Sequence, residues 1–158
     1  MGPLDLSLTR EERDRFLDDQ RTVRLATVDD GGEPQVVPLW FVWLDGEVFF
    51  NTTLGNRSVR SVEARPRAAA TVDDGEVYGE LRGVTFRGIV QRSDDDPRLG
   101  TVKAAFARKY FGGDPVPFDR WRGRAWFRLT PDHEASWDFR KIPEARERAG
   151  AAEGTGRA

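Results

Sequence analysis

The sequence contains no cysteine, which excludes disulfide bonds, thiolate nucleophiles and thiolate metal sites. Its single histidine, His133, argues against a metal site built from histidines within one chain. No apolar run approaches the roughly 20 residues that a membrane-spanning helix needs, and the first residues lack the apolar segment of a signal peptide. These absences predict a cytoplasmic protein that does not associate with a membrane.

An excess of basic charge is also missing. Asp, Glu, Lys and Arg make up 33% of the 158 residues, yet the formal net charge is −2. A general nucleic-acid-binding protein carries a basic excess, so we expect no nucleic-acid partner. The length suits one domain with a sizeable core. We expect this domain over residues 1–142 and a flexible tail over residues 143–158, where apolar periodicity ends.

Hydrophobic periodicity and turn residues predict a mainly β protein with a few helices. Thr9 and Glu12 form a capping box ahead of a helix over residues 10–19. Further helices are expected over residues 56–64 and 97–111. Strands are expected over residues 22–28, 35–44, 47–51, 67–72 and 77–92, followed by a closing hairpin of residues 124–130 and 134–139 around Pro131 and Asp132.

Strands joined mainly by hairpins imply an antiparallel sheet that bends or closes to remove its edges. We therefore predict an α+β fold, mainly β: a six-stranded antiparallel split β-barrel with flanking helices. The segment 35–44 is almost continuously apolar, which is typical of a strand with both faces covered. Gly83 and Gly88 interrupt the long segment 77–92, where they allow a bulge or a sharp bend.

The segment Phe49 to Arg60 is the strongest functional signal. It runs from a strand through a polar turn into a helix, and a helix N-terminus presents unpaired N–H groups to an anion. Arginine adds a planar set of donors that suits phosphate. The segment therefore predicts a phosphate-binding site made of Thr52, Thr53, Asn56, Arg57, Ser58 and Arg60. The alternative is a capped surface helix with solvated arginines.

The order of motifs resembles a known superfamily. The residues that carry the resemblance are Gly32, Pro34, Pro38, Trp40 and Phe41 in one strand, and the segment RSVEARPRAAATVDD that begins at Arg60. From Leu6 to about Lys141 the chain is similar to the pyridoxamine 5′-phosphate oxidase-like split β-barrel superfamily, of the FMN-binding split-barrel type. Within it the chain most resembles the flavin/deazaflavin oxidoreductases of the B group from actinobacteria.

This resemblance implies a homodimer with the cofactor at the subunit interface. The phosphate end would lie at Thr52, Thr53, Asn56, Arg57, Ser58 and Arg60, the same turn that the residues themselves indicate. The ring would pack along Val37, Pro38, Leu39 and Trp40. Trp137 would lie near the ring and Lys141 near anionic groups, although packing in a core or an interface is the alternative role for Trp137.

The resemblance implies an oxidoreductase in which reduced coenzyme F420, a deazaflavin, transfers a hydride to a conjugated or unsaturated small molecule. The cofactor carries the chemistry, which agrees with the lack of any catalytic triad or metal set in the sequence. One alternative keeps the fold and uses FMN. Another is a dimer that binds a cofactor or ligand without catalysis. The catalytic residues stay unassigned, and His133 is a candidate proton donor or simply a turn residue.

Overall fold

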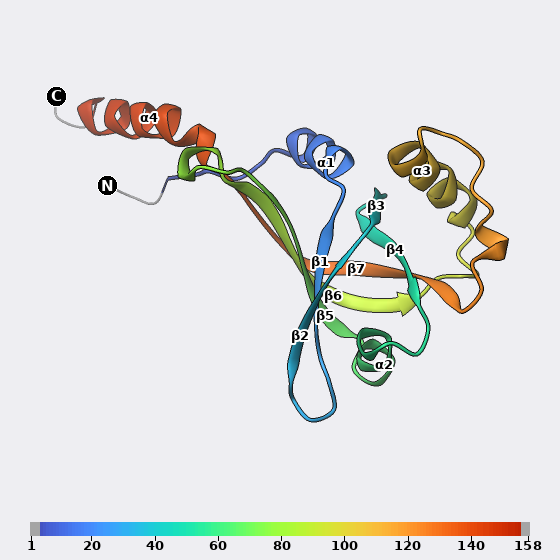
Figure 1. The fold of residues 1–158 in the computed structure, drawn as a ribbon. Coiled ribbons are helices and arrows are strands. Elements are labelled where there is room, and N and C mark those ends of the chain that lie inside the picture. Colours follow the sequence, from blue (N-terminus) through green and yellow to red (C-terminus); the bar gives the residue numbers. More distant parts are fainter. Residues whose placement is uncertain (1–3, 156–158) are drawn as a thin grey trace.

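The computed structural model describes residues 4–155 of the chain, with side chains described through residue 148. Seven strands form one antiparallel sheet in the order β2-β1-β5-β6-β7-β4-β3 (Figure 1). The strands are β1 (Val23–Val28), β2 (Pro34–Leu39), β3 (Phe41–Leu44), β4 (Glu47–Thr53), β5 (Arg67–Asp74), β6 (Arg82–Arg92) and β7 (Arg124–Asp138). The helices are α1 (Arg10–Asp19), α2 (Arg57–Ala64), α3 (Leu99–Phe111) and α4 (Ile142–Thr155), with short 3-10 turns η1 (Tyr78–Glu80), η2 (Phe118–Arg120) and η3 (Phe139–Lys141).

A one-residue corner at Trp40 determines the shape of the sheet. β2 and β3 occupy the two opposite edges of the sheet, yet β2 ends at Leu39 and β3 begins at Phe41. Because one residue spans only about 3.5 Å of chain, the two edges must curl towards each other. The result is a half-barrel, which confirms the predicted α+β split-barrel fold.

The predicted single strand over residues 35–44 and the predicted count of six strands are therefore corrected. The sequence pattern does not reveal the corner because both halves are apolar. Both strands lie at an edge of the sheet, but Val42 and Trp43 of β3 are buried, whereas the residues of β2 alternate between exposed and half-buried. The two prolines of β2, Pro34 and Pro38, fit this edge position because proline has no N–H to give to a neighbouring strand.

The predicted closing hairpin around Pro131 and Asp132 is also wrong. β7 runs without a turn from Arg124 to Asp138 and pairs with β6 from Phe127 to Asp138. The pairing register shifts between Arg87 and Gly88, where Gly88 lies opposite Pro131. A β-bulge of this kind accommodates the proline within a continuous strand. The predicted bulge at Gly88 is thus confirmed, and the expected strand 77–92 is reduced to η1 followed by β6.

Local signals in the sequence correctly predict several elements. Helix α1 has its predicted bounds, and Thr9 and Glu12 form the capping box. Asn56 caps α2 by accepting a hydrogen bond from the Val59 N–H group. Asp45 and Gly46 both have positive φ angles, 51° and 82°, as the two-residue turn between β3 and β4 requires. These elements depend on contacts within a few residues, which is why the sequence alone predicts them.

The main core fills the concave side of the sheet and is closed by α1 and α2. Its largest fully buried side chains include Phe16, Leu17, Phe41, Phe50 and Phe86. A second cluster lies under α3, where Val102 and Phe106 pack on Val42, Phe49 and Trp126. This cluster explains the stripe of apolar residues at helical spacing along residues 99–110.

Two neighbouring side chains of α3 attach that helix to the corner of the sheet. The Tyr110 hydroxyl accepts a hydrogen bond from the Phe41 N–H group over 2.8 Å and lies 2.9 Å from the carbonyl oxygens of Phe41 and Arg21. The Lys109 ammonium donates to the Leu17 carbonyl oxygen over 2.8 Å and lies 3.9 Å from the centre of the Phe41 ring. Burial lowers the pKa of Lys109 to about 8 and raises that of Tyr110 to about 12.

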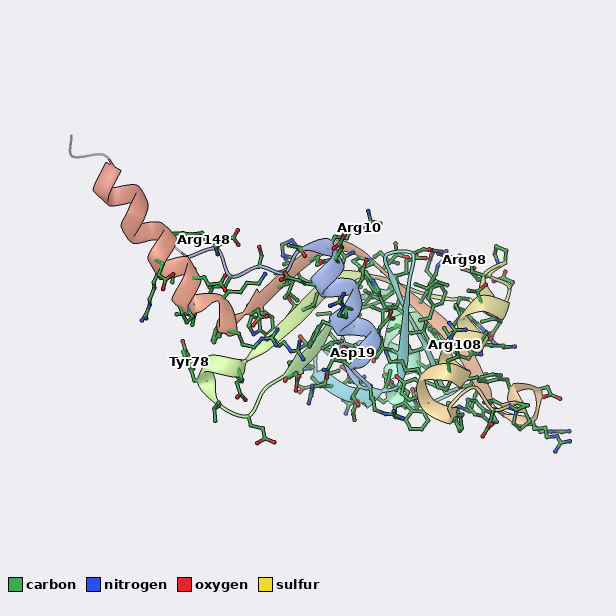
Figure 2. The ribbon with its side chains drawn as sticks, turned by 90° about the horizontal axis from the view of Figure 1, so that it is seen from above. Arg10, Asp19, Tyr78, Arg98, Arg108 and Arg148 are labelled. Atoms are coloured by element: carbon green, nitrogen blue, oxygen red, sulfur yellow. The ribbon has the colours of Figure 1, made fainter. Side chains whose placement is uncertain are left out.

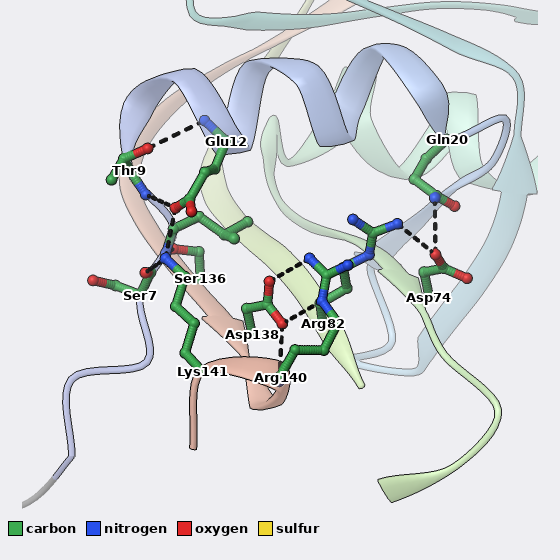
Figure 3. Close-up of polar contacts among 11 residues, drawn as sticks. Ser7, Thr9, Glu12, Gln20, Asp74, Arg82, Ser136, Asp138, Arg140 and Lys141 are labelled. Carbon is green, nitrogen blue, oxygen red and sulfur yellow. Dashed lines mark hydrogen bonds and ion pairs between the residues drawn. The ribbon is translucent and has the colours of Figure 1, made fainter. Parts of the chain in front are cut away.

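The N-terminal segment and the end of β7 form a second polar junction (Figure 3). Lys141 donates to the Ser7 carbonyl oxygen over 2.8 Å and pairs with Glu12, while Arg140 pairs with Asp138. Beyond this junction α4 projects from one end of the sheet, and α3 lies at the opposite end (Figure 2). Flexibility of residues 143–158 stays a prediction: α4 covers most of that range, and residues 156–158 lie outside the described residues.

We expect Gly88→Ala to destabilise the fold. A Cβ atom at this position would lie 2.1 Å from the Thr130 carbonyl oxygen and 2.8 Å from the Pro131 Cα atom, so the bulge would have to shift. The cost should be about 3 kcal/mol in the free energy of unfolding, measured by denaturant titration. Gly100→Ala is the matched control, because no atom lies within 4 Å of its Cβ position and alanine favours a helix. Equal stabilities of the two variants would contradict the close approach at Gly88.

Lys109 should make the stability of the protein depend on alkaline pH. Its pKa is about 8 in the folded chain against an ordinary 10.5, so between these values the unfolded chain binds the proton and the folded chain does not. The free energy of unfolding should therefore rise with pH across this window, by at most about 1.4 kcal/mol per pH unit. Chemical denaturation at pH 8 and pH 10 tests this, with Lys109→Met as the variant that lacks the rise. A parallel pH dependence in the variant would assign the effect to other groups.

Candidate functional site

The predicted ring-binding residues lie on the exposed edge of the sheet. Val37 and Leu39 are half-buried against the core, whereas Pro38 lies on the other, exposed face of β2. Trp40 forms the corner and is 45% exposed. The ring of Trp40 stacks on that of Tyr110 with centroids 4.4 Å apart and planes 9° apart. Edge strand and corner therefore present a preformed apolar surface.

Most of the polar residues predicted to bind phosphate serve the cap of α2. The Asn56 Oδ1 atom accepts hydrogen bonds from the Val59 N–H group and the Ser58 hydroxyl, and the Asn56 side-chain amide donates to the Thr52 hydroxyl over 3.1 Å. Thr52 and Ser58 are buried, whereas Thr53 is exposed. The cap orients the first turn of the helix. No hydrogen bond among the described residues uses the backbone N–H groups of Arg57 and Ser58, so these two donors are available.

The two predicted arginines of α2 line a small cavity of about 280 Å³ together with acidic residues of the β1–β2 loop. Arg57 pairs with Asp29 over 2.5 Å, and Arg60 donates to the Gly55 carbonyl oxygen. Asp30 also lines the cavity, so two arginines face two carboxylates. The hydrogen bond from Arg57 lowers the pKa of Asp29 and keeps its carboxylate charged. A phosphate that binds here would compete with Asp29 for Arg57.

Trp137 and Lys141 lie away from the other predicted site residues. Trp137 packs against Gly83, where a Cβ atom would lie 2.5 Å from its ring. Lys141 is bound to Glu12 and the Ser7 carbonyl oxygen at the end of the sheet that carries η3 and α4, whereas α2 lies at the far side of the molecule (Figures 1 and 3). No side-chain hydrogen bond or ion pair among the described residues joins either of them to β2 or α2.

A larger cavity of about 720 Å³ opens beside the corner, between β2, α3 and the loop before β7. Of the predicted residues it includes Pro38, Leu39 and Trp40. The remaining residues that line it were not predicted from the sequence as site residues: Asn51, Phe106, Phe111, Arg120, Trp121, Arg122 and Arg124. The segment RWRGR at residues 120–124 is the signal that could have revealed them, because it concentrates three arginines around one tryptophan.

The charge of this larger cavity is unbalanced. Arg124 donates to the Asn51 side-chain oxygen over 2.6 Å and to the Asn51 carbonyl oxygen over 2.9 Å, and its guanidinium lies 5.6 Å from the Trp121 ring centre. No ion pair within the described residues involves Arg120, Arg122 or Arg124, and no carboxylate lines the cavity. An apolar cavity with three arginine side chains suits a planar organic anion.

The other candidates for catalysis lie outside both cavities. His133 is exposed on β7 opposite Arg87 and lines neither of them. Among the described residues, no group of three or more His, Asp or Glu side chains is placed to hold a metal ion. No helix in the described part of the chain is long and apolar enough to cross a membrane.

Comparison with solved structures finds the same fold in several proteins. A conserved hypothetical protein of Mycobacterium tuberculosis has 26% sequence identity and a TM-score of 0.80, with 90% of this chain and 92% of that chain covered. A protein described as an F420 reductase has 25% identity and a TM-score of 0.62, with 80% and 98% covered. The haem storage protein HutZ of Vibrio cholerae, at 22% identity and a TM-score of 0.64 over 78% and 90% of the two chains, shows the fold alone.

No curated protein matches the chain significantly. The family model for pyridoxamine 5′-phosphate oxidase matches residues 9–138, which include the whole sheet and both cavities. A match of this extent agrees with the half-barrel, the edge strand β2 and the capped helix α2. The chain therefore belongs to the pyridoxamine 5′-phosphate oxidase family of split β-barrel proteins.

Proposed function

We propose that this protein is an oxidoreductase that binds the deazaflavin coenzyme F420 and reduces a conjugated or unsaturated organic molecule. The observation that carries the proposal is the position of the 720 Å³ cavity against Pro38, Leu39 and Trp40, the residues expected to support the cofactor ring. Family membership supports a flavin-type cofactor, and the structural similarity to a protein described as an F420 reductase supports the choice of F420.

The residues present fit such a cofactor. Pro38 and Leu39 would support the flat face of the ring and Trp40 its edge, since the three residues line one cavity that is open to a ligand. Val37, half-buried against the core, would hold β2 in place beneath the ring. The phosphate would meet Arg57, Arg60 and the two available backbone donors at the start of α2. Thr52, Asn56 and Ser58 would act indirectly, by holding the cap that orients these donors.

When bound, reduced F420 supplies a hydride, and the hydride transfer itself needs no acidic or basic side chain. The tasks left to the protein are to orient the ring and to exclude water from its reacting face. Trp40 and Phe111, whose rings meet edge-on with centroids 5.9 Å apart, are placed to exclude water. The proton donor is unassigned, and the chain's own candidate His133 lines neither cavity.

A homodimer with the cofactor at the subunit interface is part of the proposal. The exposure of apolar side chains along β2 supports it, because Val36 is 60% and Trp40 is 45% exposed in the single chain. A partner subunit would cover this edge. In such a dimer, Trp137 and Lys141 of one chain would approach the site of the other chain. A cytoplasmic location belongs to the proposal as well.

FMN is the second candidate cofactor. The observation that favours it is the small size of the cavity at Arg57 and Arg60, about 280 Å³, which suits a terminal phosphate better than a longer anionic tail. A dimer that binds either cofactor without catalysis is the remaining alternative, and turnover with an oxidised substrate separates it from an enzyme.

Side-by-side titration with F420 and FMN tests the choice of cofactor. The protein as purified should be colourless, should quench the fluorescence of added F420 in a saturable manner, and should leave FMN fluorescence unchanged. A yellow protein with tightly bound FMN would reverse the assignment while keeping the oxidoreductase class. Absence of binding to both would contradict the proposal.

The double variant Arg57→Gln/Arg60→Gln tests the phosphate site. Each hydrogen bond from a charged donor to phosphate contributes about 1.5–3 kcal/mol, so the dissociation constant for the cofactor should rise about 100-fold. Arg92→Gln is the matched control, since Arg92 is an exposed arginine that pairs with Asp94 and lines neither cavity. Unchanged cofactor affinity in the double variant would remove the start of α2 from the site.

A further inference from the structure

We propose that the part of the 720 Å³ cavity beyond Pro38 and Leu39, between Trp40 and the arginines of residues 120–124, is the substrate site, and that it selects a planar aromatic or conjugated molecule carrying a carboxylate or a similar anionic group. This inference rests on the proposed function, because it places the substrate against the same strand that would support the cofactor ring. It adds a substrate class and a set of selecting residues, Arg120, Arg122 and Trp40 among them.

The aromatic wall of this cavity is held rigidly. Trp40 is held on one face by the stacked Tyr110 ring, and the Tyr110 hydroxyl is in turn hydrogen-bonded to the backbone of Phe41. Phe106 supports Trp40 from within the second core cluster, with centroids 6.0 Å apart. The remaining exposed surface of Trp40 is thus fixed in orientation. A fixed aromatic surface binds a flat ligand with little loss of side-chain entropy.

The positive charge of the cavity is not balanced by carboxylates. At the smaller cavity the carboxylates oppose the arginines: Arg57 pairs with Asp29, and Asp30 also lines that cavity. Arg120 and Arg122 differ, because no ion pair in the described part of the chain includes them and no carboxylate lines their cavity. Their charge is therefore available to an anionic group on the ligand.

The backbone geometry of residues 120–124 brings these arginines to the cavity. Gly123 has a φ angle of +72°, a conformation that residues with a side chain rarely adopt, and it lets the chain turn between Arg122 and Arg124. The Gly123 carbonyl oxygen accepts a hydrogen bond from the Leu54 N–H group over 2.8 Å. The arginine loop is thus fixed to the β4–α2 turn, beside the residues expected to hold the cofactor.

The probe for this site is 1-anilinonaphthalene-8-sulfonate, an aromatic anion with a flat naphthalene ring system, whose fluorescence rises in an apolar environment. The full-length protein should bind it at one saturable site. Arg120→Gln/Arg122→Gln should raise the dissociation constant of the probe at least tenfold, and Trp40→Ala should raise it by a similar factor. Arg92→Gln should leave it unchanged. Arg124 is kept in all variants because its hydrogen bonds to Asn51 join β7 to β4.

Two comparisons make the test specific. N-phenyl-1-naphthylamine has the same rings without the sulfonate, so its affinity should be insensitive to Arg120→Gln/Arg122→Gln. The sulfonate probe should still bind when F420 is present at a saturating concentration. The variant Arg57→Gln/Arg60→Gln should bind F420 more weakly and bind the probe with unchanged affinity. If the wild-type protein does not bind F420 but binds the probe, the proposed cofactor is refuted and the anion site is not. The substrate assignment is overturned if F420 displaces the probe competitively, or if Arg120→Gln/Arg122→Gln leaves the affinity for the probe unchanged.

Discussion

The structure depends on the corner at Trp40, where the two edges of one sheet are joined by a single residue. Such a connection is possible only in a curled sheet, so the half-barrel follows from the covalent chain itself. The bend removes the backbone of Phe41 from β2, and its polar groups then need other partners. Tyr110 of α3 provides them through its hydroxyl. One tyrosine thereby couples the closure of the sheet to the position of a helix that lies far away in the sequence.

The same corner creates the candidate site. α3 must lie beside Trp40 for Tyr110 to reach Phe41, and the segment that leaves α3 then returns along the cavity towards β7. This return places Trp121 and the arginines of residues 120–124 opposite the edge strand β2. Both the apolar wall and the positive charge of the cavity are therefore consequences of how the sheet closes. The proposed cofactor bed and the proposed substrate site share this corner for that reason.

Ion pairs in this chain explain why one cavity is charged and the other is not. At the start of α3, the buried Asp96 bonds to Arg98 and Arg128, which lowers the pKa of Asp96. Glu47 supplies the second carboxylate that balances the charge of these two arginines. At α2 the Asp29 carboxylate of the β1–β2 loop neutralises the charge of Arg57. In a chain with nearly equal numbers of acidic and basic residues, a local excess arises only where folding leaves arginines without partners. The loop at residues 120–124 is such a place.

The sequence by itself determined the elements whose stabilising contacts are local: the capping box of α1, the cap of α2, and the turn at Asp45 and Gly46. Gly88 also indicated a bulge, although the strand that pairs with β6 at this bulge, β7, was expected to turn there. It also indicated Pro38, Leu39 and Trp40, which the structure brings to a cavity. Only the tertiary structure decided that residues 35–44 divide between two edges, that β7 passes through Pro131 without a turn, and which arginines stay unpaired. The physical reason is that strand pairing and ion pairing join residues far apart in the chain, and a local pattern of apolar or charged residues carries no information about the distant partner.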